Sequence, residues 1–444
     1  MWHHPAILTR KLCLMLVVGL TLSACSEKEV ILPGERIAIT SAGPGYLLEP
    51  DASAASEGAL AGEAQENSRF ETPGFSDNHA GGNFAADLPL TAAYHIDVGI
   101  DADIGTELAQ PVAGDGRIFT IMPLGDLRAT SISDGKPVWR MDIDTSSDKT
   151  QVSISGGLGL EGDVLYAHAG KEYLFALNAA TGEEIWSTKF DDFLVGGPTI
   201  SSGVVIVTDV SGRVIAVSSE DGQQIWSRIG SRGDTRVNGS SFPAIMENEV
   251  IIGGAEGELI SLSLDQGQIN WGEFLSPSNF LTALDTFSDI TAHPVHDGGL
   301  VVVITQSGLM VAFNARSGRV VWEHELRGIT MPWLAGQSIF VSTVNGQLYA
   351  LRRVDGALRW KTDLPGSFDI NEPISEDAHI YASPIVVSGK VLVPGTTGQL
   401  HVFDADTGEA EQALSARGPV TTAPIVVDGT VFTLNRDGGL TAFR

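Results

Sequence analysis

Two short groups of residues are of the types that bind metal ions. His324-Glu325 matches the start of a zinc-protease helix, but the second histidine is missing and the pair lies in a predicted strand. Asp404, Asp406 and Gly408 match part of a calcium loop, but the later bidentate glutamate is missing, which favours a plain turn. The sequence contains no Gly-x-Ser-x-Gly motif and no phosphate-binding loop. We therefore predict no catalytic residue, no metal ligand and no cofactor.

Cys25 has the clearest predicted chemistry, because it ends a segment laid out like a signal peptide. Arg10 and Lys11 precede an apolar run, Leu12 to Leu22, and small residues lead into the cysteine. The run is shorter than the about 20 residues that span a bilayer, which disfavours a permanent transmembrane helix. The tetrad Leu22-Ser23-Ala24-Cys25 resembles the lipobox of bacterial lipoproteins, whose cysteine is acylated after cleavage. We expect residues 1–24 to be removed and Cys25 to carry a lipid; the alternative is an ordinary secretory signal that ends in a cysteine.

The residues around this anchor indicate where the mature chain resides. Ser26 stands where an aspartate commonly retains such lipoproteins at the inner membrane, so the resemblance implies a lipid-anchored protein on the periplasmic face of the outer membrane. Acyl chains hold a protein on a membrane through about 0.8 kcal/mol per buried CH₂ group. Cys13 lies in the removed segment, so no disulfide can form within the mature chain, and burial of a core must stabilise it.

Composition favours many short strands and argues against polyanionic partners. The 444 residues include 51 glycines, 43% apolar residues and only 18% charged residues, which is typical of short strands joined by tight turns. The formal net charge of −28 would repel phosphate over most of the surface, so nucleic acid and anionic membrane surfaces are unfavourable partners.

The segment after Cys25 is expected to be a tether. From Ser26 to about Ala85 it is rich in Ala, Gly, Ser, Glu and Pro, with few aromatic residues and no sustained period. We assign residues 25–88 to a lipidated N-terminus and a flexible acidic tether. The apolar island at Val30 to Pro33 is either a hydrophobic remnant of this linker or a short docking peptide.

A repeat occupies the rest of the chain, residues 89–444. In its first half a glycine is followed four residues later by a tryptophan, at Gly135/Trp139, Gly182/Trp186, Gly222/Trp226, Gly267/Trp271, Gly318/Trp322 and Gly356/Trp360. In its second half a proline opens a strand, at Pro111, Pro198, Pro243, Pro294, Pro332, Pro384 and Pro424, with Gly157 in the same place in the remaining unit. Successive tryptophans are 47, 40, 45, 51 and 38 residues apart, which suits four strands and their turns.

Eight such units predict an all-β fold, an eight-bladed β-propeller of four-stranded antiparallel blades. Each tryptophan would lie on the outer strand of a blade and pack against the next blade. The seventh turn has Gln412 in place of tryptophan, and the eighth unit ends at Arg444 before any outer strand. Leu90 to Gly99 can supply the missing strand, with Tyr94 at the tryptophan position, so that an N-terminal strand closes the ring.

The pattern from Ala179 through Gly182 to Trp186 resembles the pyrroloquinoline-quinone-type propeller repeat over about residues 89–444. With a lipobox in front, the sequence is similar to the BamB family, lipoprotein subunits of the β-barrel assembly machinery (the BAM complex). The resemblance implies a monomeric, non-catalytic subunit that binds the periplasmic POTRA domains of BamA. It also implies help in folding and inserting outer-membrane proteins, with unfolded forms of these proteins as further partners.

The family's partner-binding residues match this sequence only in part. Its two hydrophobic positions before an Arg-Gly pair fall on Thr235 and Val237, and Asn238 stands where the arginine would be. Its Asp-x-Asp before a strand-opening proline falls on Asp289 and Thr291. Only Val237 and Asp289 keep the expected type.

Loop lengths favour the same region without the resemblance. The segments 227–241 and 272–293 are long neighbours that emerge on one face of a propeller. The second carries apolar loop residues, Phe274, Leu275, Phe280, Leu281, Leu284 and Phe287. Such residues form a binding surface when they are exposed; alternatively they tuck under their own loops.

Two other functions fit a propeller of this kind. A periplasmic quinoprotein dehydrogenase resembles this chain in its repeats, but that class has adjacent cysteines over the quinone and a calcium ion with a catalytic aspartate. The mature chain has no cysteine pair, which disfavours this enzyme. A propeller that binds a sugar or peptidoglycan on one face is the third hypothesis.

Overall fold

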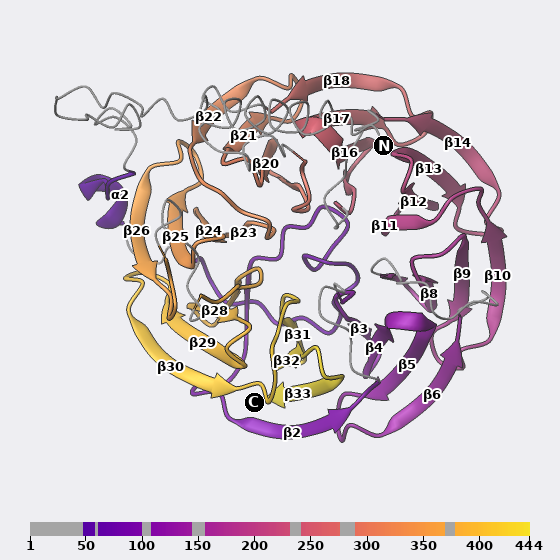
Figure 1. Cartoon of the computed structure of the whole chain (residues 1–444), viewed down its shortest axis with the longest axis horizontal. Coiled ribbons are helices and arrows are strands. Elements are labelled where there is room, and N and C mark those ends of the chain that lie inside the picture. The colour runs from indigo at the N-terminus through magenta and orange to yellow at the C-terminus, as the bar shows by residue number, and fades with distance from the viewer. Residues whose placement is uncertain are drawn as a thin grey trace, which may run out of the picture. The chain divides into compact units, whose positions relative to one another are not determined.

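The structure is a computed structural model that describes residues 48–57, 61–99, 108–143, 156–230, 241–275, 289–368 and 378–444. The chain from Tyr46 to Arg444 forms one compact unit. In its described residues the strands form eight sheets arranged in a ring (Figure 1). The predicted all-β, eight-bladed propeller is therefore confirmed. No helix among the described residues is both long enough and apolar enough to cross a membrane.

Each of the first four blades has four antiparallel strands. From the axis outward, blade 1 is β3 (Val112–Gly114), β4 (Arg117–Met122), β5 (Asp126–Ser131) and β6 (Pro137–Asp142); blade 2 is β7 (Gly157–Glu161), β8 (Val164–His168), β9 (Tyr173–Asn178) and β10 (Glu184–Lys189); blade 3 is β11 (Leu194–Ser201), β12 (Val204–Asp209), β13 (Arg213–Ser218) and β14 (Gln224–Ile229); blade 4 is β15 (Ala244–Met246), β16 (Glu249–Gly253), β17 (Glu258–Ser263) and β18 (Ile269–Phe274). Two 3₁₀ turns, η1 (Pro123–Gly125) and η2 (Ala255–Gly257), join the middle strands of blades 1 and 4.

The other four blades repeat this order, with two additions from the N-terminal part of the chain. Blade 5 is β19 (Val295–Asp297), β20 (Leu300–Ile304), β21 (Met310–Asn314) and β22 (Val320–His324); blade 6 is β23 (Trp333–Ala335), β24 (Ser338–Ser342), β25 (Gln347–Arg352) and β26 (Leu358–Asp363); blade 7 is β27 (Ile385–Val387), β28 (Lys390–Pro394), β29 (Gln399–Asp404) and β30 (Ala410–Ser415), with β1 (Asn83–Phe84) added at its axial edge; blade 8 is β31 (Ile425–Val427), β32 (Thr430–Leu434), β33 (Gly439–Phe443) and β2 (Ala92–Asp97). A short helix, α2 (Ala52–Ala55), precedes β1.

The tryptophans of the repeat link each blade to the next. Each lies on an outer strand, and its indole N–H donates to a backbone carbonyl of the following blade, over 3.0 Å from Trp139 Nε1 to Ala179 O. The other pairs are Trp186 with Ser219, Trp226 with Leu264, Trp271 with Ala315, Trp322 with Arg353 and Trp360 with Ala405. Because each ring also covers the turn glycine of the following repeat, that position has no room for a side chain; a Cβ on Gly222 would lie 2.6 Å from Trp186.

The ring closes as the strand count predicts. β2 pairs with β33 in antiparallel register, with Tyr94 opposite Ala442. The Tyr94 hydroxyl donates to Ile132 O of blade 1 over 2.8 Å, which replaces the indole contact of the other blades. Gln412 makes the corresponding contact from blade 7, since its Nε2 donates to Leu90 O over 3.0 Å.

The segment before β2 differs from the predicted flexible tether. Residues 65–86, here called the axial plug, cross the middle of the ring (Figure 1) and contain Phe70 and Phe84, which are 0% and 2% exposed. Their rings pack on each other with centroids 6.1 Å apart, and Phe84 also contacts the Trp333 ring. The plug is therefore part of the folded propeller domain.

The plug bonds to the innermost strands of blades 1, 2 and 4 to 7, and to the turn after β31 in blade 8. Its backbone partners are Ala113 with Phe70, Leu160 with Glu71, Ile245 with Asp77, His296 with Asn78, Leu334 with Gly82, Val386 with Asn83 and Asp428 with Asn67. The edge of an innermost strand presents unpaired N–H and C=O groups to the axis, and the plug satisfies some of them. This pairing, with the buried phenylalanines, explains why a segment without sequence periodicity is ordered.

Candidate partner-binding face

Strand order gives the ring two different faces. The turns from first to second and from third to fourth strands lie on one face, here called the hairpin face. The connections from each outer strand to the next innermost strand lie on the opposite one, the connector face. Of the residues predicted to bind a partner, Thr235, Val237, Asn238, Phe280 and Phe287 lie in connections outside the described residues. Their role stays a prediction.

Asp289 and Thr291 are described, in the connection before β19. The Asp289 carboxylate is buried, and its Oδ1 accepts a hydrogen bond from the Glu256 backbone N–H over 2.9 Å. Glu256 lies in turn η2 with a positive φ of 57°, so this bond stabilises a turn that a non-glycine residue rarely adopts. In this structure the Asp289 carboxylate stabilises the connector face of blade 4 through this bond, and its role in partner binding stays a prediction.

A recess of about 60 Å³ lies beside this connection, between blades 3 and 4. Its lining includes three carboxylates, Asp209, Glu258 and Asp289, together with Thr291. Asp209 Oδ1 accepts hydrogen bonds from the backbone N–H groups of Ser211 and Arg213, both over 2.9 Å. The carboxylates thus organise turns, and Asp209 Oδ2 also lies 3.8 Å from Arg213 Nε. The recess is lined by carboxylates that bond within the protein, and an N–H-donating group of a partner would add to these bonds.

A second cavity, of about 90 Å³, lies at the connector end of the axis. Residues just before the innermost strands line it, including Thr291, His293, Thr330 and Thr421, and Pro73 of the plug also contributes. Burial, followed by the neighbouring His79, lowers the pKa of His293 to about 3, so this ring is neutral at pH 7. The described lining carries no charge, and Thr291 joins this axial cup to the acidic recess.

The described residues do not fit the site of a quinoprotein. That site needs adjacent cysteines and a carboxylate-held calcium ion, and both cysteines of the sequence precede the described residues. Among the described residues, no group of three or more His, Cys, Asp or Glu side chains could hold a metal ion. The axial cup also lacks a described cation that could pair with an acidic quinone.

The sequence did not indicate the recess, because Asp209, Glu258 and Asp289 come from separate strands and connections. Asp209 is followed by Ser211 and Gly212, which signals a turn between strands. Nothing in the spacing distinguishes this turn from those of other blades, so only the packing of blades 3 and 4 brings the carboxylates together.

Comparison with known proteins assigns the chain to a family. The family model described as outer membrane protein assembly factor BamB matches residues 124–362 and 367–444. The BamB of Yersinia pestis is 26% identical over 333 residues, which cover 73% of this chain and 81% of that protein. The BamB of Escherichia coli K12 is 25% identical and covers 74% of this chain and 82% of that protein.

Solved structures show the same fold. BamB from Moraxella catarrhalis matches with a TM-score of 0.68 at 19% identity, covering 80% of this chain and 100% of that chain. Quinohemoprotein alcohol dehydrogenase from Comamonas testosteroni matches with a TM-score of 0.67 at 14% identity, covering 88% and 83%. The dehydrogenase shares only the propeller architecture, whereas the family model covers most of the sequence. The chain belongs to the BamB family of outer membrane protein assembly factors.

Proposed function

We propose that this protein is a non-catalytic scaffold subunit of the BAM complex that assists folding and insertion of β-barrel proteins into the outer membrane. The match of the BamB family model to residues 124–362 and 367–444, from the third strand of blade 1 onward, carries this proposal. Fold alone would leave an enzyme open, since a dehydrogenase shares the ring.

The proposal includes a lipid anchor at Cys25 that holds the protein at the periplasmic face of the outer membrane. It rests on the sequence from Arg10 to Ser26, which lies outside the described residues. The mature, lipidated protein would act as a monomeric subunit without a cofactor.

The proposed partner is the set of POTRA domains of BamA, bound at the connector face of blades 3 to 5. The acidic recess lies there, and its lining includes Gly230, Ser241 and Asp289, which flank in sequence the connections that carry Val237, Phe280 and Phe287. Phe274, at the end of β18, is 64% exposed and begins the apolar connection before β19. Phe274 pairs across the sheet with Glu258 of the recess, and aromatic residues are enriched in protein interfaces.

The test is affinity purification of the lipidated protein from membranes, with binding of purified BamA POTRA domains as a second measurement. Val237→Glu should lower POTRA affinity by at least about tenfold, which corresponds to about 1.4 kcal/mol. The matched control is Val138→Glu, because Val138 is 45% exposed on the outer strand of blade 1, away from the connector face. Absence of BamA from the native purification would refute the assembly role, and equal loss in both variants would refute the site.

Asp289 needs a separate variant, because its carboxylate bonds to turn η2. Asp289→Asn keeps the shape and an acceptor oxygen but removes the charge, so the turn should persist. Weaker POTRA binding with an unchanged melting temperature would assign the charge to partner recognition. Unchanged binding would leave Asp289 with its structural role.

A further inference from the structure

The outer strand of blade 6 differs from the other outer strands. The residue before the repeat tryptophan is an exposed Val or Ile in four blades, namely Val138, Ile185, Ile225 and Val321, which are 45–50% exposed. In blade 6 this residue is Arg359, which is 1% exposed, and Leu358 beside it is also buried. An arginine on an outward-facing strand position is normally solvated, so its burial requires a specific cover.

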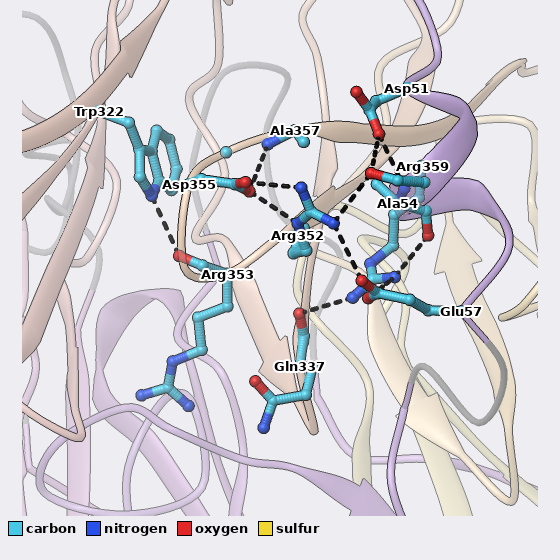
Figure 2. Close-up of polar contacts among 12 residues, drawn as sticks. Asp51, Ala54, Glu57, Trp322, Gln337, Arg352, Arg353, Asp355, Ala357 and Arg359 are labelled. Atoms are coloured by element: carbon cyan, nitrogen blue, oxygen red, sulfur yellow. Dashed lines mark hydrogen bonds and ion pairs between the residues drawn. The ribbon is translucent and has the colours of Figure 1, made fainter.

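Residues 51–57, including helix α2, form that cover (Figure 2). The Asp51 backbone N–H donates to Leu358 O at the start of β26 over 2.8 Å. The Asp51 carboxylate caps α2 by accepting from the Ala54 N–H over 2.9 Å. The segment therefore approaches the strand in a fixed orientation, with its carbonyl groups and Glu57 near Arg359.

Two arginines of blade 6 bind this segment (Figure 2). Arg359 Nη1 donates to Ala54 O and lies 2.8 Å from Glu57 Oε2, while Arg352 Nη1 lies 2.9 Å from Glu57 Oε1. Asp355 fixes Arg352 in turn, over 2.6 Å. The two oxygens of one carboxylate thus bridge two guanidinium groups, and charge-assisted bonds of this kind are among the stronger ones in proteins.

These contacts favour the chain's own segment as the occupant of this surface. A buried guanidinium is unfavourable without an anion and acceptors, and Ala54 O, Glu57 and Gln337 O supply them to the two Nη atoms of Arg359. The bonds from Arg352 and then Arg359 lower the pKa of Glu57, so its carboxylate stays ionised at neutral pH. The cover, unlike the plug, therefore depends mainly on polar contacts at the circumference.

We propose that the outer strand of blade 6 is a docking site for the acidic segment 51–57, and that this rim clamp fixes the N-terminal region to the circumference of the ring. If Cys25 carries a lipid, as proposed above, the clamp limits the length of free chain between the lipid and the folded ring. An extended chain from Cys25 to Asp51 reaches at most about 90 Å, whereas a chain running to Ala61 would reach about 120 Å. The clamp thereby shortens the reach of the ring from the membrane and favours the blade 6 side as the point of attachment.

Hydrogen exchange on the full mature chain with Cys25→Ser, which needs neither lipid nor BamA, tests the clamp. The amides of Ala54 and Ala55 should exchange at least about tenfold more slowly than in an unstructured peptide. Glu57→Gln and Arg359→Met should each remove this protection. Glu57 is partly exposed, so its variant keeps the test valid even if loss of Arg359 impairs folding.

Arg140→Met is the matched control, because Arg140 lies on the outer strand of blade 1, 63% exposed, and pairs with Asp126. It should leave exchange of Ala54 and Ala55 unchanged. Unstructured exchange rates at residues 51–57 of the native chain, or full protection in Glu57→Gln, would overturn the proposal. Failure of BamA binding or of acylation would leave these results unaffected, so the two proposals fail separately.

Discussion

Phe70→Ala tests whether the axial plug is part of the folded core. The Phe70 side chain is fully buried, and its ring lies 5.8 Å from Phe75 and 6.1 Å from Phe84, measured between centroids. Removing a buried phenylalanine ring typically lowers the free energy of unfolding by about 3–5 kcal/mol, through lost burial and the cavity that remains. The backbone bonds between Phe70 and Ala113 can persist, so we expect a value near the lower end, about 3 kcal/mol.

The assay is urea unfolding of the mature chain with Cys25→Ser, followed by tryptophan fluorescence. Phe274→Ala serves as the control because Phe274 is 64% exposed, and it should change the free energy of unfolding by less than about 0.5 kcal/mol. If Phe70→Ala has as small an effect as this control, the plug contributes no buried core and the flexible tether expected from composition is correct.

Three further results are expected. Gly222→Ala should lower the free energy of unfolding by about 2–4 kcal/mol, because the added Cβ meets the Trp186 ring. Gly116 has a similar positive φ but open space around it, so Gly116→Ala should lower the free energy of unfolding by only about 1 kcal/mol in the same urea assay. Burial lowers the pKa of His79 to about 4, below the value of an exposed histidine. The neutral ring therefore contributes up to about 3 kcal/mol to the free energy of unfolding above pH 6.5, and this contribution is lost as the pH falls towards 4. Measurements of the free energy of unfolding against pH should show a smaller loss in His79→Gln. Gln412→Ala should cost about 1 kcal/mol by removing the bond to the next blade, and a neutral result would show that this bond is dispensable.

The propeller itself was predictable because its repeat reflects recurring packing needs. Each Trp donates to the next blade and covers the next turn glycine, so residue types and spacing are both preserved from unit to unit. Tyr94 could be placed by counting, since a ring of four-stranded blades that lacks one outer strand must take it from the other end of the chain.

The plug and the rim clamp could not be predicted in the same way. The plug makes roughly one backbone contact per blade along an irregular path, so it leaves no period of 2 or 3.6 in its sequence. The only sign of the clamp in the sequence is Arg359, which stands where four other blades have Val or Ile. Its partner Glu57 lies about 300 residues earlier in the chain. The acidic recess likewise joins residues from different strands, and most predicted partner-binding residues lie beyond the described part of the chain.

The plug also determines from which side the axis of the ring can be approached. At the hairpin end of the innermost strands, Arg69 of the plug bonds to Asp115 and to the Gly162 carbonyl in the turns of blades 1 and 2. At the other end the axial cup remains, with Pro73 contributing to its wall and Thr291 joining it to the acidic recess. Among the described residues the cup lies at the connector end, so we expect a partner that engages it to approach from the connector face. The segment that composition marks as a tether thus occupies the axis of the propeller and leaves a described cup at the connector end, on the face where the proposed partner-binding residues lie.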